Sequence, residues 1–119
     1  MTEEEVINCI VTWLQNDGWG IHINIGHAQG PDIVALRNNE KWIIEAKGEG
    51  VHAQANRNNF LALLGTIVLG ISDERVKYSI ALPNIPKFRN LLNGVSELVR
   101  QRTGLTILLV SPECGIEEL

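Results

Sequence analysis

Cysteine is scarce in this 119-residue chain, and its two cysteines lie near opposite ends of the sequence. Cys9 and Cys114 show no C-x-x-C spacing or other arrangement typical of a metal site, which argues against a zinc centre. We therefore predict two reduced thiols in a cytosolic protein. The sequence also lacks a Ser-His-Asp or Cys-His arrangement, so nucleophilic catalysis by an activated serine or cysteine is not expected.

Long apolar runs are absent as well. No stretch approaches the ~20 residues needed to span a bilayer, and no signal peptide precedes Thr2. We therefore predict a cytoplasmic protein with no membrane partner. The chain shows no internal repeat, low-complexity tract or linker, which predicts a single domain over residues 1–119. One domain of this size supplies a single core, so sequence recognition could require a further recognition subunit.

Positive charge is also limited. The chain has 10 Lys and Arg residues against 14 Asp and Glu residues, a formal net charge of −4. This balance is unusual for a protein that binds duplex DNA non-specifically, and no dense run of basic residues occurs. Contact with phosphate groups would therefore depend on a local basic patch or on a bound divalent cation.

What the sequence does contain is a segment, residues 30–48, with the pattern of a β-hairpin. Two apolar and β-branched runs, 32–37 and 41–47, are separated by Asn38 and Asn39. Asparagine tolerates the positive φ that a tight hairpin turn requires. The segment therefore predicts two adjacent antiparallel strands.

The length of the turn determines which residues of the hairpin face each other. With a two-residue turn, Arg37 faces Glu40, and Asp32 then lies directly opposite Glu45. Opposed residues point to the same face with Cβ atoms about 4.5–5.5 Å apart, and Lys47 shares that face. Two carboxylates at ~5 Å repel by roughly 3 kcal/mol at an effective dielectric near 20. A bound Mg²⁺ or Mn²⁺ would remove that repulsion, because such ions prefer oxygen ligands.

A purely structural interpretation of these residues stays open, in which Asp32 begins a strand beside a Gly-Pro turn and Glu45 and Lys47 form a solvated edge. The flanking residues favour a different environment. Glu45 follows Trp42-Ile43-Ile44 and precedes Ala46, so both faces of the strand are largely apolar. We therefore predict a central strand that is covered on both sides.

Pro31-Asp32, followed thirteen residues later by Glu45-Ala46-Lys47, resembles the P-D…(D/E)-x-K signature of the restriction-endonuclease-like nuclease superfamily. That superfamily places the two motif parts on adjacent antiparallel strands, as the hairpin register indicates here. The resemblance implies a metal-dependent DNA endonuclease. Asp32, Glu45 and the backbone carbonyl of Ala46 would hold Mg²⁺ or Mn²⁺, and Lys47 would orient the attacking water or stabilise the developing charge.

In the resembled superfamily, the helix before the sheet often supplies one more acid to the metal site. Here the candidates are Glu3 and Glu5. Two purely structural roles also remain open for these acids. Acidic residues in a first helical turn favour the helix dipole, and Thr2-x-x-Glu5 is typical of a capping box.

The same resemblance suggests residues that would contact the substrate. Gln54 and Arg57, in the first turns of the helix after the hairpin, correspond to polar or basic residues beside the superfamily's site. A surface-exposed polar turn accounts for them equally well. His27 and Gln29 lie in the loop that leads to Asp32, and they could also reach a substrate.

Hydrophobic periodicity predicts the remaining elements. Helices are expected over 2–16, 53–69 and 86–102, the last as one helix or two because Gly94 interrupts it, and strands over 19–26, 32–37, 41–47, 76–82 and 105–110. The acidic tail, 113–119, is expected to fray. Within the helix over 53–69, the residues expected to be buried are Phe60, Leu61, Leu64, Ile67 and Val68. The order α-β-β-β-α-β-α-β predicts a mixed α/β sheet flanked by helices, as in the resembled nuclease core.

Two alternative functions remain open. The acidic charge and short length are compatible with a nuclease-fold domain that binds DNA or regulates a partner without cutting. A Holliday-junction-resolvase-like nuclease that recognises branched DNA is the other alternative. Because one core carries one presumed active site and a duplex has two strands, we predict a two-fold homodimer acting on DNA.

Overall fold

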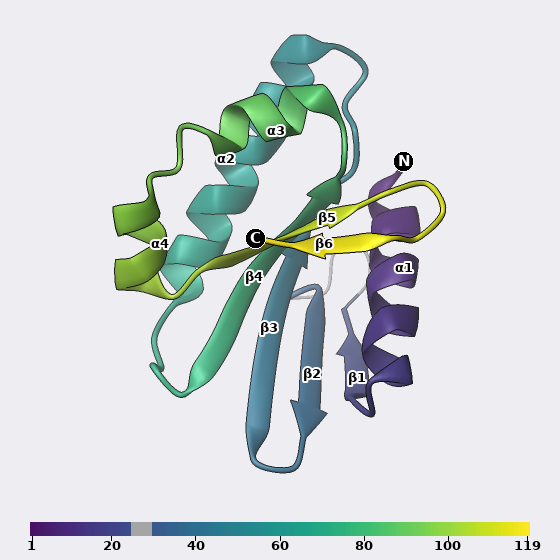
Figure 1. Cartoon of the computed structure of the whole chain (residues 1–119), viewed down its shortest axis with the longest axis vertical. Coiled ribbons are helices and arrows are strands. Elements are labelled where there is room, and N and C mark those ends of the chain that lie inside the picture. The colour runs from purple at the N-terminus through teal and green to yellow at the C-terminus, as the bar shows by residue number, and fades with distance from the viewer. Residues whose placement is uncertain (25–29) are drawn as a thin grey trace.

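The computed structural model describes residues 1–24 and 30–119. Within these ranges the elements are α1 (Glu3–Asn16), β1 (Gly20–Ile23), β2 (Ile33–Arg37), β3 (Glu40–Ala46), α2 (Ala53–Gly70), β4 (Val76–Pro83), α3 (Pro86–Leu92), α4 (Glu97–Thr103), β5 (Thr106–Val110) and β6 (Ile116–Glu118). The strands form one sheet in the order β1-β2-β3-β4-β5-β6 (Figure 1). Strands β3, β4 and β5 are parallel to one another, and the other neighbours are antiparallel. This confirms the predicted mixed α/β fold.

The sheet is covered on both faces, so two separate hydrophobic cores form (Figure 1). Helix α1 packs on one face, where it buries Val6, Ile10 and Leu14 against the sheet. Helices α2 and α3 pack on the other face, with Phe60 and Phe88 in that core. The central position of β3 and its cover on both sides agree with the predicted apolar character of that strand.

Helix α1 begins with the capping box that the sequence predicted. The backbone N–H of Glu5 donates to Thr2 Oγ1 at 3.1 Å, and the N–H of Thr2 donates to Glu5 Oε2 at 3.0 Å. Both bonds satisfy N–H groups that a helix leaves without partners at its first turn. Glu5 therefore has a structural role at the helix start.

Helix α2 meets the sheet through a stripe that overlaps only in part with the predicted one, since Phe60 and Ile67 are buried and Leu64 is partly buried, as expected. The buried residues are Phe60, Leu63 and Ile67, whereas Leu61 is 50% exposed and Val68 is 43% exposed. The expectation that Leu61 and Val68 are buried is wrong. The helix is apolar nearly all round between positions 60 and 69, so periodicity alone does not identify the face that packs on the sheet.

The segment expected as one helix or two over 86–102 forms two short helices. Helix α3 has Pro86 at its first turn and buries Phe88 and Leu92. Helix α4 begins after Ser96, whose hydroxyl accepts the backbone N–H of Val99 at 3.2 Å. Helix α4 buries none of its own residues. None of the helices in the described ranges combines the length and the apolar character that crossing a bilayer requires.

Three tryptophans, one of them on α1, pack together where α1 meets the sheet. Trp42 of β3 makes edge-to-face contacts with Trp13 and Trp19, with ring centroids 5.8 Å and 5.6 Å away. The Trp42 indole N–H donates to Ser79 Oγ at 2.8 Å, so its polar atom is satisfied in the interior. This cluster joins α1 and the first strands to the centre of the sheet.

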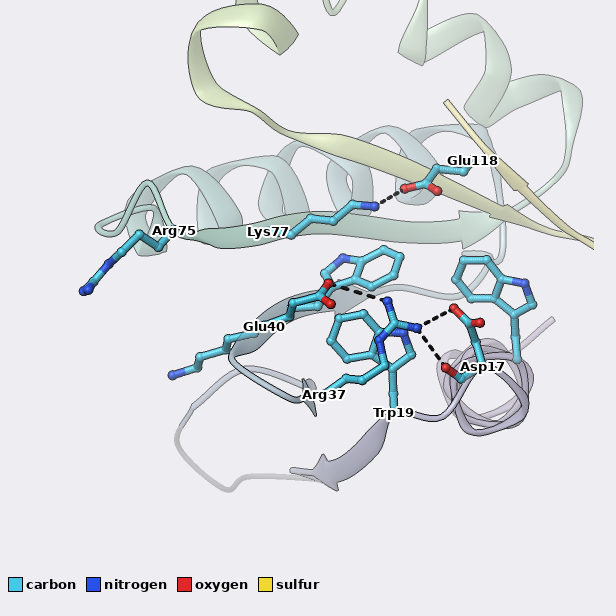
Figure 2. Close-up of a pocket in the computed structure, with 10 residues that line it drawn as sticks. Asp17, Trp19, Arg37, Glu40, Arg75, Lys77 and Glu118 are labelled. Carbon is cyan, nitrogen blue, oxygen red and sulfur yellow. Dashed lines mark hydrogen bonds and ion pairs between the residues drawn. The ribbon is translucent and has the colours of Figure 1, made fainter.

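A hollow of about 310 Å³ lies beside this tryptophan cluster. Figure 2 shows that charged side chains around it pair with one another. Arg37 Nη1 lies 2.9 Å from Asp17 Oδ2, and its guanidinium carbon lies 4.3 Å from the Trp19 ring centroid. Lys77 Nζ lies 2.6 Å from Glu118 Oε2. These ion pairs therefore stabilise the packing at this end of the sheet.

The C-terminal tail was expected to fray, and that expectation is wrong. Residues Ile116–Glu118 form β6, which pairs antiparallel with β5. The backbone N–H of Leu119 donates to the carbonyl of Ile107 at 2.8 Å, and the reverse bond is 3.1 Å long. Two acidic side chains of the tail pair with basic residues on neighbouring elements, Glu117 with Arg89 and Glu118 with Lys77, each at 2.6 Å. Backbone pairing therefore outweighs the polar composition on which the expectation rested.

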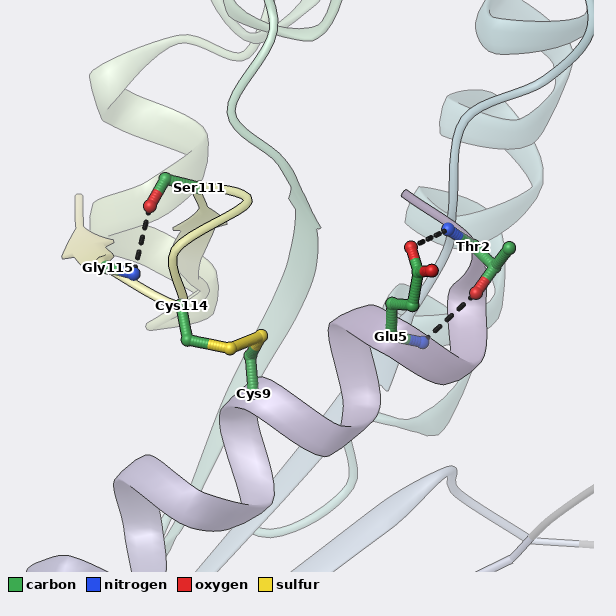
Figure 3. The surroundings of a disulfide bond; sticks show 6 residues. All are labelled: Thr2, Glu5, Cys9, Ser111, Cys114 and Gly115. Carbon is green, nitrogen blue, oxygen red and sulfur yellow. Dashed lines mark hydrogen bonds between the residues drawn. A yellow bond between two sulfur atoms is a disulfide. The ribbon is translucent and has the colours of Figure 1, made fainter.

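Cys9 and Cys114 are joined in a disulfide, so the prediction of two reduced thiols is wrong (Figure 3). The two Cα atoms lie 5.1 Å apart although the residues are separated by 105 positions. Cys9 is on α1 and Cys114 is in the turn between β5 and β6, where its φ of 63° is left-handed. Sequence spacing gave no sign of this contact because only the tertiary fold brings α1 beside that turn. The cytoplasmic location stays a prediction.

Candidate active site

The β2–β3 hairpin has the predicted register. Arg37 pairs with Glu40 and Ile33 pairs with Ile44, and Asn38 adopts the left-handed φ of 54° that the turn needs. Strand β2 begins at Ile33, so Asp32 stands immediately before the strand and one position beyond the last ladder pair. Continuing the register places Asp32 opposite Glu45.

Asp32 is held in place by hydrogen bonds on both sides. Its carboxylate Oδ2 accepts the backbone N–H of Ala46 at 2.8 Å, and its carbonyl accepts the backbone N–H of Asn24 at 2.9 Å. The Asn24 side-chain amide donates to the Pro31 carbonyl at 2.7 Å. The end of β1 and the end of β3 therefore fix Asp32 together. The sequence gives no signal for the bond to Ala46, because the Asp32 side chain there takes the place of a backbone partner in the ladder.

Glu45 lies in an environment that disfavours its charged form. Burial, followed by the negative charge of Asp32 and a hydrogen bond to it, raises the pKa of Glu45 from 4.5 to about 7, and Glu3 adds a smaller effect in the same direction. Such a shift means that the two carboxyl groups are close enough to interact strongly. A carboxyl group with this pKa at the end of a central strand is typical of a functional site.

Lys47 lies beside the acids but is engaged by α1. Its Nζ is 3.3 Å from Glu3 Oε1, and its backbone N–H donates to the Ala81 carbonyl at 3.1 Å. The structure thus brings Glu3, rather than the capping residue Glu5, to the predicted site. Asp32, Glu45, Lys47 and Glu3 form one cluster of ionisable groups, which we call the carboxylate site.

The segment after Lys47 packs tightly against the start of α1. A Cβ at Gly48 would overlap the backbone of Thr2 and Glu3, so only glycine permits this approach. The backbone N–H of Glu49 donates to the Met1 carbonyl at 2.9 Å. This packing brings Glu3 into the carboxylate site, and the glycine after Lys47 was the sequence signal for it.

In the part of the chain that the structure describes, the residues predicted to contact the substrate are not brought into contact with the acids. Gln54 and Arg57 are exposed on the first turns of α2, and Gln54 Nε2 donates to Asn58 Oδ1 at 3.1 Å along the helix. No contact found in the described ranges joins either residue to the acids. His27 and Gln29 lie outside the described residues. All four therefore stay predictions.

The donor groups of the carboxylate site suit a hard divalent cation. Ala46 places its N–H on the Asp32 side of β3, and a residue in an extended strand presents its N–H and C=O at the same edge. Two carboxylates and one carbonyl thus lie together, and Mg²⁺ commonly binds one or two carboxylates and completes its shell with water. Over residues 1–24 and 30–119, no group of three or more His, Cys, Asp or Glu side chains is arranged to hold a metal. With two carboxylates and one carbonyl as donors, Mg²⁺ would complete its coordination shell with water.

The tryptophan-lined hollow is a separate feature. None of the predicted site residues lines it. Several of its charged side chains are paired, Arg37 with Asp17 and Glu40, and Lys77 with Glu118. Asp32 and Glu45 are instead two acids that face each other. We therefore assign the candidate site to the carboxylates and not to the hollow.

Comparisons with known proteins support the fold. No family model matches the sequence, and no curated protein matches it. An XisH family protein from Nostoc punctiforme superposes with a TM-score of 0.64 at 17% identity, over 95% of this chain and 96% of the other. An fdxN element excision controlling factor protein from Anabaena variabilis gives 0.65 at 18% identity, over 96% of each chain. The likeness is one of fold. It extends over nearly the whole length of the chain.

Proposed function

We propose that this protein is a metal-dependent DNA endonuclease that hydrolyses phosphodiester bonds at the carboxylate site. The observation that carries the proposal is the pair Asp32 and Glu45, which face each other at the end of a central strand. Burial together with the charge of Asp32 raises the pKa of Glu45 to about 7. A pair of repelling acids is unfavourable for a hairpin alone but suits a site that receives a cation. The neighbour named as an excision controlling factor supports DNA as the substrate class.

Each residue of the carboxylate site would have a separate role in hydrolysis. Asp32 and Glu45, with the Ala46 carbonyl, would hold Mg²⁺ or Mn²⁺. When bound, the cation supplies Lewis-acid stabilisation of phosphate charge and activation of water at neutral pH. The Lys47 ammonium would orient the attacking water or stabilise the charge that develops on the phosphate. Glu3, 3.3 Å from Lys47 Nζ, positions that ammonium.

Cleavage of DNA by the purified chain is the first test. We expect nicking or cutting with Mg²⁺ or Mn²⁺ and none with EDTA, because the acids require a cation to act on a phosphodiester. Supercoiled, linear and branched DNA are compared, and preference for the branched substrate would identify a structure-specific nuclease. Absence of cleavage on all three substrates with either metal would contradict the endonuclease proposal.

A second candidate function is a nuclease-fold subunit that binds DNA or regulates a partner without cutting. The specific observation that favours it is the ion pair between Lys47 and Glu3, which engages the ammonium that catalysis would need. Several other basic side chains are likewise paired, such as Arg37 with Asp17 and Arg89 with Glu117. Phosphate binding through free positive charge would therefore be modest.

Lys47→Ala distinguishes the two functions. For the endonuclease we expect the variant to lose cleavage while Mg²⁺ still stabilises the protein, because the two acids remain and only the ammonium is removed. Lys41→Ala is the matched control, since Lys41 is an exposed lysine on β3, the strand that leads to Lys47. The measurements are the cleavage rate and the Mg²⁺-dependent shift of the melting temperature. Retention of full cleavage by Lys47→Ala would remove Lys47 from the proposed mechanism.

A further inference from the structure

Most of the exposed large apolar side chains lie on two helices, α2 and α4. Of the eight large apolar side chains exposed in the described ranges, five lie on these two helices. On α2, Leu61 is 50%, Val68 43% and Leu69 89% exposed. On α4, Leu98 is 54% and Val99 42% exposed. Exposed apolar side chains that gather on one side of a protein mark an interaction surface.

On α2 these residues form a stripe. Leu61, Gly65, Val68 and Leu69 follow the spacing i, i+4, i+7 and i+8, which places them on one side of a helix. We call this stripe, together with Ala62 and Thr66, the outer face of α2. It lies opposite the residues that α2 buries against the sheet.

The outer face of α2 offers nothing for a charged partner. After Arg57 the helix contains no charged residue. The Thr66 hydroxyl donates to the Ala62 carbonyl at 2.9 Å, so the hydroxyl on this face is already satisfied within the helix. A membrane surface is also a poor fit, because helices that lie on membranes flank their apolar stripe with Lys and Arg. The face therefore suits a partner that is equally apolar and uncharged.

The order of residues along the outer face makes it complementary to itself. Gly65 stands at its centre, and nothing lies within 4 Å of the position that a Cβ at Gly65 would occupy. Leu61 and Leu69 stand four residues before and four residues after it. Two antiparallel copies crossing at Gly65 would approach closely there, and each Leu61 would pack against Leu69 of the other copy. This self-matching pattern is what a two-fold interface requires.

Helix α4 widens the surface. Ile71, directly after α2, and Thr103, the last residue of α4, line a common depression, so the C-terminal ends of the two helices lie near each other (Figure 1). The 18-residue α2 is about 27 Å long, the 7-residue α4 is about 10 Å long, and each helix is about 10 Å wide. That gives roughly 370 Å² per copy and about 750 Å² in total, which is below the ~1,000 Å² of a stable interface and fits a weak, transient contact.

We propose that two copies of this chain pair about a two-fold axis near Gly65, through the outer face of α2 flanked by α4. This inference names the surface of the homodimer, and it does not depend on the proposed nuclease activity. The small area predicts an association that is reversible at micromolar concentrations.

Sedimentation of the full chain, from micromolar concentrations to about a hundred times higher, tests the proposal. Wild type is expected to shift from a monomer of 13.2 kDa toward twice that mass. Leu61→Glu is expected to raise the dissociation constant at least ~10-fold, because it buries a charge in an apolar contact. Leu36→Glu is the matched control, since Leu36 is 54% exposed but lies on β2. It should leave the dissociation constant unchanged.

Gly65→Gln separates loss of the interface from loss of the fold. Glutamine is a better helix former than glycine, and the site has open space, so the melting temperature of the monomer should not fall. The added side chain nevertheless blocks close approach at the axis, and the dissociation constant should again rise at least ~10-fold. A chain that stays monomeric throughout, or a dimer that survives both Leu61→Glu and Gly65→Gln, would overturn the proposal. So would a dimer that Leu36→Glu dissociates.

Discussion

Glu45→Gln is expected to lower the rate of DNA cleavage by about 10²–10³-fold or more, because it removes one of the two charged oxygen donors proposed to hold the cation. The substitution keeps the size of the side chain, so the strand and its register should be preserved. The rate of nicking of supercoiled DNA in Mg²⁺ measures the effect. Glu40→Gln, on the same strand and exposed, should cleave at the wild-type rate.

The same variant is expected to be more stable than wild type in metal-free solution near pH 8. Ionised Glu45 is partly buried and faces Asp32, so its neutral replacement removes the cost of burying a charge and the repulsion by Asp32, together about 1–2 kcal/mol after allowance for solvent screening. Asp32→Ala should behave in the opposite way. It leaves the buried N–H of Ala46 without its partner, which costs about 1–3 kcal/mol.

Asp32→Asn completes this comparison, because an amide oxygen can still accept the Ala46 N–H. It should be inactive yet at least as stable as Asp32→Ala. A Glu45→Gln variant that cuts DNA at the wild-type rate would remove Glu45 from the proposed metal site. A Glu45→Gln variant that melts well below wild type would instead show that Glu45 serves the fold.

The second expected result concerns pH and Mg²⁺ together. Glu45 has a higher pKa in the folded protein, about 7, than its usual 4.5. Folding therefore favours the protonated form, and the associated stability is fully present below about pH 4.5 and lost as the pH rises through about 7. The metal-free protein should become less stable over this window. Because a cation binds the ionised carboxylate, millimolar Mg²⁺ should raise the melting temperature more at about pH 8 than at about pH 5.

Melting curves of wild type and Glu45→Gln at several pH values isolate this effect from that of other titrating groups. The difference between the two proteins should grow as the pH rises from about 5 to about 8. The Mg²⁺-dependent shift should be small in the variant at every pH. A wild-type melting temperature that does not respond to Mg²⁺ at about pH 8 would contradict the metal site and favour the non-cutting subunit.

The sequence by itself determined the local features of this protein. The capping box at Thr2 and Glu5, the Asn38 turn and the hairpin register depend on residues close together in the chain, and the structure confirms each of them. Short-range hydrogen bonding and backbone sterics set these features wherever the segment lies. The motif residues Asp32 and Glu45 could be placed opposite each other for the same reason.

Only the tertiary structure decided the features that depend on distant segments. The disulfide between Cys9 and Cys114 and the pairing of β6 with β5 require the C-terminal turn to lie beside α1 and the sheet edge. The choice of Glu3 over Glu5 beside Lys47 follows from the close packing of Gly48 on the start of α1. The buried face of α2 was likewise undetermined, because a helix that is apolar nearly all round can pack through several stripes. The sheet selected the stripe of Phe60, Leu63 and Ile67 and left Leu61 and Val68 exposed, since contacts between elements, rather than the order of residues within one, fix which face is buried.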